Sequence, residues 1–378
     1  MWLVAIAAAL LALVTGWLPV ETAGESLARV APVLVFVVAV SVIAELADSA
    51  GVFDAAAGRA AALGRGSVRR LWLLLVLVGT VATILLSLDT TAVLLTPVVL
   101  ALARRLGLPV VPFAMTTVWL ANTASLLLPV SNLTNLLAVQ QLGLGAFGYA
   151  ARMWAPAVVA VGVSVAVLAL RYRRDLRGRY ALPAGRPAPD RVLFRVSTAV
   201  CVAIGPLVVV GVPAVWVAVL GATTLGLMFL LRRKEELRLA LVPWQLVLVV
   251  AGLFLVVAGA QPHGLGDLAR DALGSGGGLP DLLRVGGVGG ASANLVNNLP
   301  AYFGLEPATG GGDRLLALLI GVNVAPLVLP WGSLATLLWR DRARSAGAAV
   351  PWREFVTIGL IGAPLLVLAS VTALWLTG

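Results

Sequence analysis

The chain is poor in the side chains that most catalytic and metal sites use. It contains one cysteine, Cys201, one histidine, His263, and one lysine, Lys234. A single cysteine excludes an internal disulfide and a thiolate cluster for a soft metal. We interpret His263 as a surface histidine in a loop rather than a ligand. We therefore expect no metal site and no cofactor, and the absence of a nucleophile–base pair argues against an enzyme.

Charged residues are also scarce. They make up 12% of the 378 residues, whereas hydrophobic residues make up 60%, and the mean hydropathy is +1.01. A soluble domain has about 25% charged residues, and apolar runs long enough to span a bilayer recur along the whole chain. The sequence therefore predicts an all-α polytopic membrane protein. Residues 2–20 lack a basic flank, so we expect a retained helix there rather than a signal peptide.

The net charge of +10 comes from 26 arginines and one lysine. On a soluble protein this balance would suggest a nucleic-acid partner, but here the arginines cluster in short loops, as the positive-inside rule describes. We therefore expect no nucleic-acid partner and a place in the inner (plasma) membrane. Placing all basic loops in the cytoplasm gives nine crossings and two hairpins, with the N-terminus cytoplasmic and the C-terminus extracytoplasmic. These loops are Arg59 to Arg70, Arg104-Arg105, Arg171 to Arg191, Arg232 to Arg238 and Arg340 to Arg344.

Two segments that lie 201 residues apart are nearly the same. Residues 122–137 and 323–338 are identical at 8 of 16 aligned positions, including the first asparagine and a central proline. Each places polar residues and proline inside an apolar run, which membranes tolerate only where the backbone is buried in protein or lines a cavity. The prolines alone would be compatible with simple kinks. Their duplication predicts two broken helices, at 108–142 and 314–339, and such paired breaks point to a transporter's binding site.

Two further segments are predicted to be re-entrant hairpins. The apolar run 71–102 has 32 residues and basic flanks on both sides. Both of its ends therefore lie on one side of the membrane, and 32 residues are short for two spans of about 20 residues plus a turn. We expect a hairpin at 71–105 with its tip near Ser87 to Thr91; the alternative is two short full spans. A second hairpin is expected at 280–312, with its tip near Asn294 to Asn298, where the alternative is an ordinary loop turn.

These parts form two units of the same order. Gly51 to Asp54 parallels Gly264 to Asp267, and Asp89-Thr90 parallels Asn297-Asn298. The first unit begins with a helix that enters the cytoplasm and the second with one that leaves it, so the units form inverted-topology repeats. The expected division is an N-terminal scaffold helix at 1–27, repeat one at 28–170, a basic cytoplasmic loop at 171–192, scaffold helices at 193–242 and repeat two at 243–378.

The tips and breaks offer hydroxyl and amide groups, with no arginine or lysine. This set suits a small neutral polyhydroxy species or an alkali cation better than a dianion, which favours a guanidinium. The candidate substrate-binding residues are Ser87, Thr90, Thr91, Asn122, Thr123, Ser125, Ser131, Asn132, Asn135, Asn294, Asn297, Asn298, Asn323, Ser333 and Thr336.

Asp89 is the one carboxylate among these groups. An acid inside the membrane is by default a functional-site hypothesis, and it can bind and release a proton. The alternative is a helix N-cap, because Asp89 precedes a Thr-Thr-Ala-Val run. Glu45 and Asp48, at the cytoplasmic end of their span, are interpreted as interfacial. We therefore assign proton coupling to Asp89.

Four motifs in order resemble the arsenical pump membrane protein family of the ion transporter superfamily. They are Leu88 to Leu100, Asn122 to Asn135, Asn297 to Pro300 and Gly332 to Trp339. The resemblance implies efflux of arsenite and antimonite, as neutral trihydroxides, in exchange for protons. It also implies a scaffold domain, a mobile transport domain that moves as an elevator, and a homodimer in the bilayer. The tip reads Asp89-Thr90 where the family usually has two adjacent acids.

Other functions remain open on the residues alone. A sodium/proton antiporter or a carrier of another small oxo-species, such as silicic acid, would use a similar set of groups. A passive channel fits the proline-broken layout less well. A soluble ATPase is a possible partner that would dock on the basic cytoplasmic loops.

Overall fold

The computed structural model describes residues 2–181 and 190–378, so residues 182–189 of the expected basic loop lie outside the described residues. In the described ranges every regular element is a helix, with one isolated β-bridge between Ser67 and Arg179. Seven helices are long and apolar enough to cross a membrane. The helices are α1 (Trp2–Val14), α2 (Val20–Ser49), α3 (Val52–Leu63), α4 (Val68–Leu85), α5 (Leu88–Thr90), α6 (Thr96–Arg105), α7 (Val110–Thr123), α8 (Leu133–Leu142), α9 (Ala146–Arg171), α10 (Arg191–Val209), α11 (Ala214–Arg232), α12 (Trp244–Ala260), α13 (Leu265–Leu273), α14 (Leu279–Val296), α15 (Asn298–Leu305), α16 (Gly312–Val324), α17 (Leu334–Ser345) and α18 (Trp352–Thr377).

The N-terminal helix is shorter than the sequence predicts. The expected span 2–20 ends at Val14, because Gly16 adopts a positive φ of 72° and Pro19 starts the next helix. Thirteen residues reach only about 20 Å at 1.5 Å per residue, less than the ~30 Å hydrocarbon core. Helix α2 begins at Val20 and extends to 30 residues, longer than the expected 28–47.

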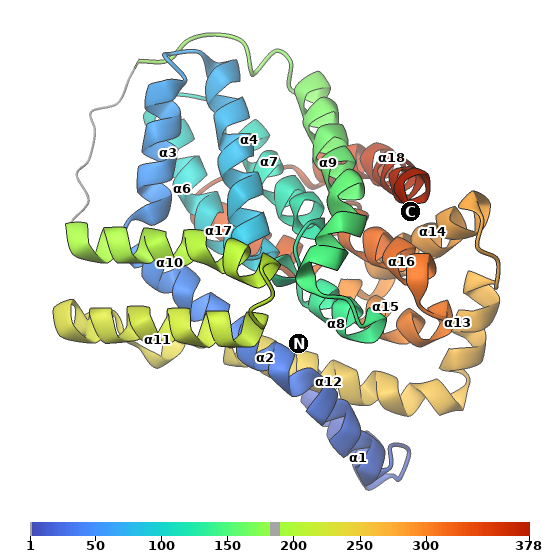
Figure 1. The fold of residues 1–378 in the computed structure, drawn as a ribbon. Coiled ribbons are helices and arrows are strands. Elements are labelled where there is room, and N and C mark those ends of the chain that lie inside the picture. The colour runs from blue at the N-terminus through green and yellow to red at the C-terminus, as the bar shows by residue number, and fades with distance from the viewer. Residues whose placement is uncertain (1, 182–189) are drawn as a thin grey trace.

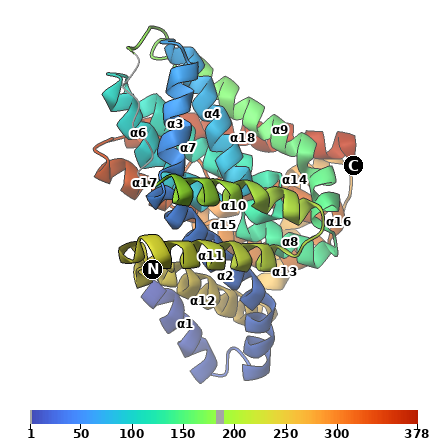
Figure 2. The ribbon, with the colours of Figure 1, turned by 60° about the vertical axis from the view of Figure 1, so that its left-hand side comes forward.

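Five helices gather on one side of the molecule. Helices α1, α2, α10, α11 and α12 pack mainly on one another, through the pairs α1–α12, α2–α11, α2–α12 and α10–α11. In Figures 1 and 2 α1, α11 and α12 lie toward the bottom of the molecule with α10 above α11, and most of the other helices, here called the upper group, lie above α11 and α12. Thus α2 and α12, which begin the two predicted repeats, belong mainly to the group of five: α2 packs on α10 and α11, and α12 packs on α1 and α2.

The two halves of the chain show the same order of elements. In each, a long helix leads to a short one, a helical hairpin, a broken helix and a final long helix. Helices α4 and α14 both have 18 residues, and α9 and α18 both have 26. Gly51 and Gly264 both occupy the left-handed region directly before α3 and α13. The inverted orientation of the two units depends on the membrane plane and stays a prediction.

Hydrogen bonds connect three of the five basic loops. The Tyr180 amide donates to the Gly66 carbonyl at 2.9 Å, and the Tyr180 hydroxyl donates to the Ala61 carbonyl at 2.6 Å. Asp190, which caps the start of α10, accepts a hydrogen bond of 2.8 Å from Arg232 Nε at the end of α11. The Arg232 guanidinium lowers the pKa of Asp190. These contacts join the loops at 59–70, 171–191 and 232–238.

The remaining two basic loops continue the same chain of contacts. Arg233 donates to the Ser49 carbonyl at 3.0 Å, at the end of α2. Arg342 interacts electrostatically with Asp48, the residue directly before Ser49. Arg104 lies beside Gly347, after α17. All five basic segments therefore lie on one side of the molecule.

Candidate functional site

Four helical segments begin near one another, directly after the chain breaks that the sequence predicts. Their N-cap residues are Ser87, Asn132, Asn297 and Ser333, and each side chain accepts a hydrogen bond from a backbone N–H of the first turn. The four distances are 3.2, 3.3, 3.3 and 3.1 Å. The segment at Ser87 continues through a π-helical stretch, Thr91–Leu95, into α6. Helix N-termini carry partial positive charge, so this arrangement favours electron-rich oxygen atoms.

The capping pattern gives a second way to align the two hairpin tips. The sequence comparison pairs Asp89-Thr90 with Asn297-Asn298, which stays a prediction. Ser87 and Asn297 each cap the segment that follows the first helix of their hairpin. When the tips are aligned on these N-caps, Asp89 corresponds to Leu299, and the acid has an apolar counterpart in the second half.

Asn323, at the end of α16, reaches across to the break in the first half. Its Oδ1 accepts hydrogen bonds of 2.9 Å from Asn132 Nδ2 and from Thr134 Oγ1. Its Nδ2 donates to Asn135 Oδ1 at 3.0 Å. All four residues are buried. Asn323 thus connects the end of α16, before the break in the second half, to the start of α8, after the break in the first half.

Asn122, at the end of α7, makes the reciprocal contact. Its Nδ2 donates to the Val118 carbonyl at 2.9 Å and, at 3.4 Å, to Thr336 Oγ1 in the break of the second half. The pair Asn122–Thr336 and the pair Asn323–Asn135 are related by the same offset of 201 residues. Asn122 Oδ1 is buried and has no hydrogen-bond partner among the described residues.

Asn294 has a structural role. Its Nδ2 donates to the carbonyls of Gly290 and Ala325 at 2.9 and 2.8 Å. Its Oδ1 accepts from the amides of Val328 and Leu329 at 3.2 and 3.0 Å. These four bonds hold the irregular segment that follows α16, so this amide has no capacity left for a ligand.

Several predicted hydroxyl residues also satisfy the local backbone or a neighbouring hydroxyl. Because these buried hydroxyls already have hydrogen-bond partners within the protein, they stabilise the breaks rather than face a cavity. They are Thr91, bonded to Thr83 at 2.7 Å; Thr123, bonded to the Trp119 carbonyl at 2.8 Å; Ser125, bonded to the Asn122 carbonyl at 2.9 Å; and Ser131, bonded to the Ile84 carbonyl at 2.9 Å. Thr90 bonds Ser87 Oγ at 3.0 Å.

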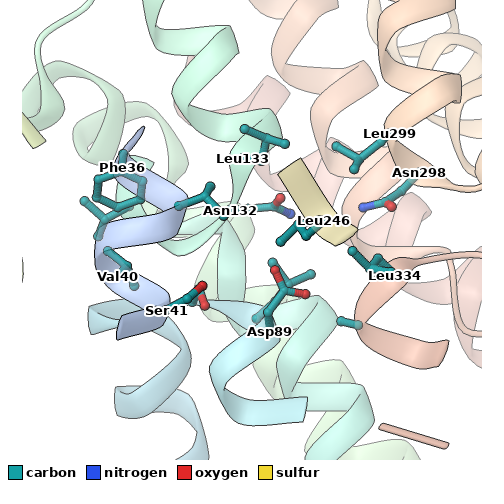
Figure 3. Close-up of a pocket in the computed structure, with 15 residues that line it drawn as sticks. Phe36, Val40, Ser41, Asp89, Asn132, Leu133, Leu246, Asn298, Leu299 and Leu334 are labelled. Atoms are coloured by element: carbon teal, nitrogen blue, oxygen red, sulfur yellow. The ribbon is translucent and has the colours of Figure 1, made fainter. Parts of the chain in front are cut away.

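Four of the predicted residues line one cavity, Ser87, Asp89, Asn132 and Asn298. Figure 3 shows Asp89, Asn132 and Asn298 pointing toward a common space. The first turns of α15 and α17 line the same cavity, so all four helix starts meet there. Its volume is about 30 Å³, room for about two water molecules. A larger species therefore requires the helices around the cavity to move.

Two polar groups in this cavity have no partner. The Asp89 carboxylate makes no hydrogen bond or ion pair with any described residue and is half-buried. Asn298 Oδ1 is buried and has no hydrogen-bond partner in the same part of the chain. Its own backbone amide donates to the Gly332 carbonyl at 2.9 Å, which fixes the residue in place. Both oxygens are available to accept hydrogen bonds from a ligand.

The sequence did not reveal the opposite wall of the cavity. Helix α2 supplies Phe36, Val37, Val40 and Ser41, and α12 supplies Leu246. The four α2 residues share one helix face, as their spacing requires. Their only signal was one hydroxyl in an apolar run, which does not distinguish a cavity wall from an ordinary membrane helix.

Phe36 also lines a second hollow. The second hollow has a volume of about 330 Å³ and lies among α2, α8, and the turn between α10 and α11. Its lining includes Phe36, Pro129 and Gln140. Phe36 is buried, and its side chain belongs to the walls of both spaces.

Comparison with known proteins agrees with the membrane architecture. A profile of the citrate transporter family matches residues 1–321. The arsenical pump membrane protein of Escherichia coli is 30% identical over 356 residues, which cover 86% of this chain and 81% of that protein. The arsenical pump membrane protein of Yersinia enterocolitica is also 30% identical over 356 residues, with the same coverage. At this identity and coverage, the chain belongs to the arsenical pump membrane protein family of the ion transporter superfamily.

Proposed function

We propose that this membrane transporter exports arsenite and antimonite, as neutral trihydroxides, in exchange for protons. The observation that carries the proposal is the composition of the central cavity. It combines neutral amides and hydroxyls with one unpaired carboxylate, Asp89, and its lining contains no arginine, lysine or histidine. The two arsenical pump membrane proteins that this chain resembles point, by name, to the same substrate class.

The same composition argues against citrate, although the matching profile is described as a citrate transporter. A polyanion bound here would face the Asp89 carboxylate with no guanidinium or ammonium beside it. Recognition of carboxylates normally uses such cations. A neutral trihydroxide instead has three O–H groups that can donate hydrogen bonds. The oxygens of Asp89 and Asn298, which have no partner among the described residues, can accept them.

Asp89 couples the substrate to protons in this proposal. The ionised carboxylate accepts a hydrogen bond from a substrate hydroxyl, and a hydrogen bond to a charged group contributes about 1.5–3 kcal/mol, or roughly 10- to 150-fold in affinity. When a proton from the outer side binds Asp89, the carboxylate loses a hydrogen-bond acceptor and gains a donor, which weakens binding of the substrate. The proton then returns inward on Asp89 and leaves at the cytoplasmic side. Protons and substrate thus exchange at one site.

Alternating access would arise by movement of the upper helices against the lower group of five. The small volume of the central cavity supports such a movement, because a substrate larger than water cannot enter it unless the helices move. The contacts among the basic loops support one cytoplasmic face, and the proposal keeps the N-terminus inside and the C-terminus outside. The homodimer and a soluble ATPase that docks on this basic face remain part of the proposal.

The proposal is tested by arsenite resistance in a host that lacks its own efflux system. Wild-type protein should restore growth, and Asp89→Asn and Asn132→Ala should restore little. Sodium dependence of the transport would identify a sodium-coupled carrier instead. Protection against silicic acid accumulation, without protection against arsenite, would identify the other oxo-species.

A further inference from the structure

A surface groove lies between α9 and α18, away from the central cavity. Its volume is about 440 Å³. Figure 1 shows the two helices side by side at the edge of the molecule, and they pack directly on each other. Apolar side chains form most of its walls, namely Val167, Leu170, Ile358, Ile361 and Leu365. Leu170 is 71% exposed and Ile361 is 61% exposed, so this apolar surface is open to the membrane.

One end of the groove is basic. The helices run antiparallel, since Arg171 at the end of α9 bonds Glu354 at the start of α18 at 2.7 Å, and Arg152 lies beside Gly378 at the opposite end. Arg353, next to Glu354, also lines the groove.

The two arginines leave one positive charge without a partner. Arg171 pairs with Glu354, whereas the Arg353 side chain is exposed and makes no hydrogen bond or ion pair with any described residue. Trp352, stacked under Arg340 at 5.6 Å, lies at the same end. Tryptophan and arginine together mark the depth of lipid headgroups. The groove therefore runs from headgroup depth into the hydrocarbon region.

We propose that this groove binds a phospholipid with an anionic headgroup. The headgroup phosphate lies at Arg353, with Arg171 adjacent, and one acyl chain lies along Ile358, Ile361 and Leu365. The charge fits an anionic lipid, because the polar end carries two guanidiniums and one carboxylate. Arginine clusters between membrane helices recognise such headgroups. The site is separate from the transport cavity and does not depend on the identity of the transported substrate.

The test uses the purified full chain in detergent with added phosphatidylglycerol or phosphatidylcholine of equal acyl length. Retained lipid is measured by native mass spectrometry, and thermal unfolding is measured in parallel. Phosphatidylglycerol should be retained more strongly and should raise the unfolding temperature more. Arg353→Gln should weaken its retention about fivefold, as expected for one arginine near an anionic lipid surface.

Two further variants make the test specific. Arg195→Gln removes an exposed arginine of α10, outside the groove, and should leave retention unchanged. Ile361→Trp fills the groove without changing its charge and should reduce retention of phosphatidylglycerol. Equal retention of the two lipids, or an equal loss in Arg195→Gln, would overturn the proposal. An equal effect of glycerol phosphate, which has no acyl chains, would also overturn it in favour of a simple anion site.

Discussion

At the scale of single residues, the amides divide into those that hold the structure and those that face the cavity. The sequence places a polar set at the breaks but does not show which of its groups the protein itself satisfies. It could not show that Asn294 uses all four of its hydrogen-bonding positions on backbone, because three of those partners lie in the irregular segment after α16, more than 30 residues along the chain. It also could not show that Asn298 keeps an oxygen without a partner.

This division predicts opposite effects for two asparagines. Asn323→Ala would leave Asn132, Thr134 and Asn135 without their shared partner. Each buried polar group left unpaired costs about 1–3 kcal/mol, so thermal unfolding in detergent should occur at a clearly lower temperature. Unfolding at the wild-type temperature would show that the network does not stabilise the paired breaks.

Asn298→Ala should instead affect transport with little effect on stability. The substitution removes an acceptor that has no partner in the described protein. Loss of one neutral hydrogen bond to substrate corresponds to about 0.5–1.5 kcal/mol, or roughly 2- to 12-fold in KM for arsenite. The measurement is initial uptake into everted vesicles across a range of arsenite concentrations. An unchanged KM for arsenite would show that Asn298 does not contact the substrate.

At the scale of elements, most helix bounds and the interruptions between α7 and α8 and between α16 and α17 could be predicted from apolar length, proline and basic flanks. The re-entrant course of the two hairpins stays a prediction. The end of the first helix could not be predicted, because apolar composition continued through the turn at Gly16 that ends it. The wall formed by α2 was also missed. Which face of an apolar helix meets a cavity is decided by its neighbours, and periodicity alone gives no sign of it.

Close packing of α14 on α16 gives a prediction at this scale. A Cβ atom at Gly321 would collide with the backbone carbonyl of Gly286, whereas a Cβ atom at Gly287 would meet nothing within 4 Å. Gly321→Ala should therefore destabilise the protein by about 1–3 kcal/mol or more, as overpacking does. Gly287→Ala is the matched control and should be neutral. Thermal unfolding and the yield of monodisperse protein measure both, and equal behaviour of the two variants would contradict the packing.

At the scale of the whole molecule, the basic loops predict orientation. Their contacts place all five on one face, which the positive-inside rule assigns to the cytoplasm. With Cys201 replaced by serine, single cysteines can report the side of each loop. Gly277→Cys and Thr377→Cys should react with an impermeant maleimide in intact cells, and Arg177→Cys should react only in everted vesicles. Labelling of residue 177 from outside would reverse the orientation.

The central claim is that Asp89 couples protons to substrate in a cavity of neutral groups. Its most direct test is labelled arsenite uptake into everted vesicles with an imposed proton gradient. Asp54→Asn, which changes an exposed acid on α3, serves as the control and should match wild type. Asp89→Asn keeps an acceptor oxygen, so counterflow exchange of arsenite should persist, while accumulation driven by the proton gradient should be lost. Wild-type, pH-dependent accumulation by Asp89→Asn would contradict the account.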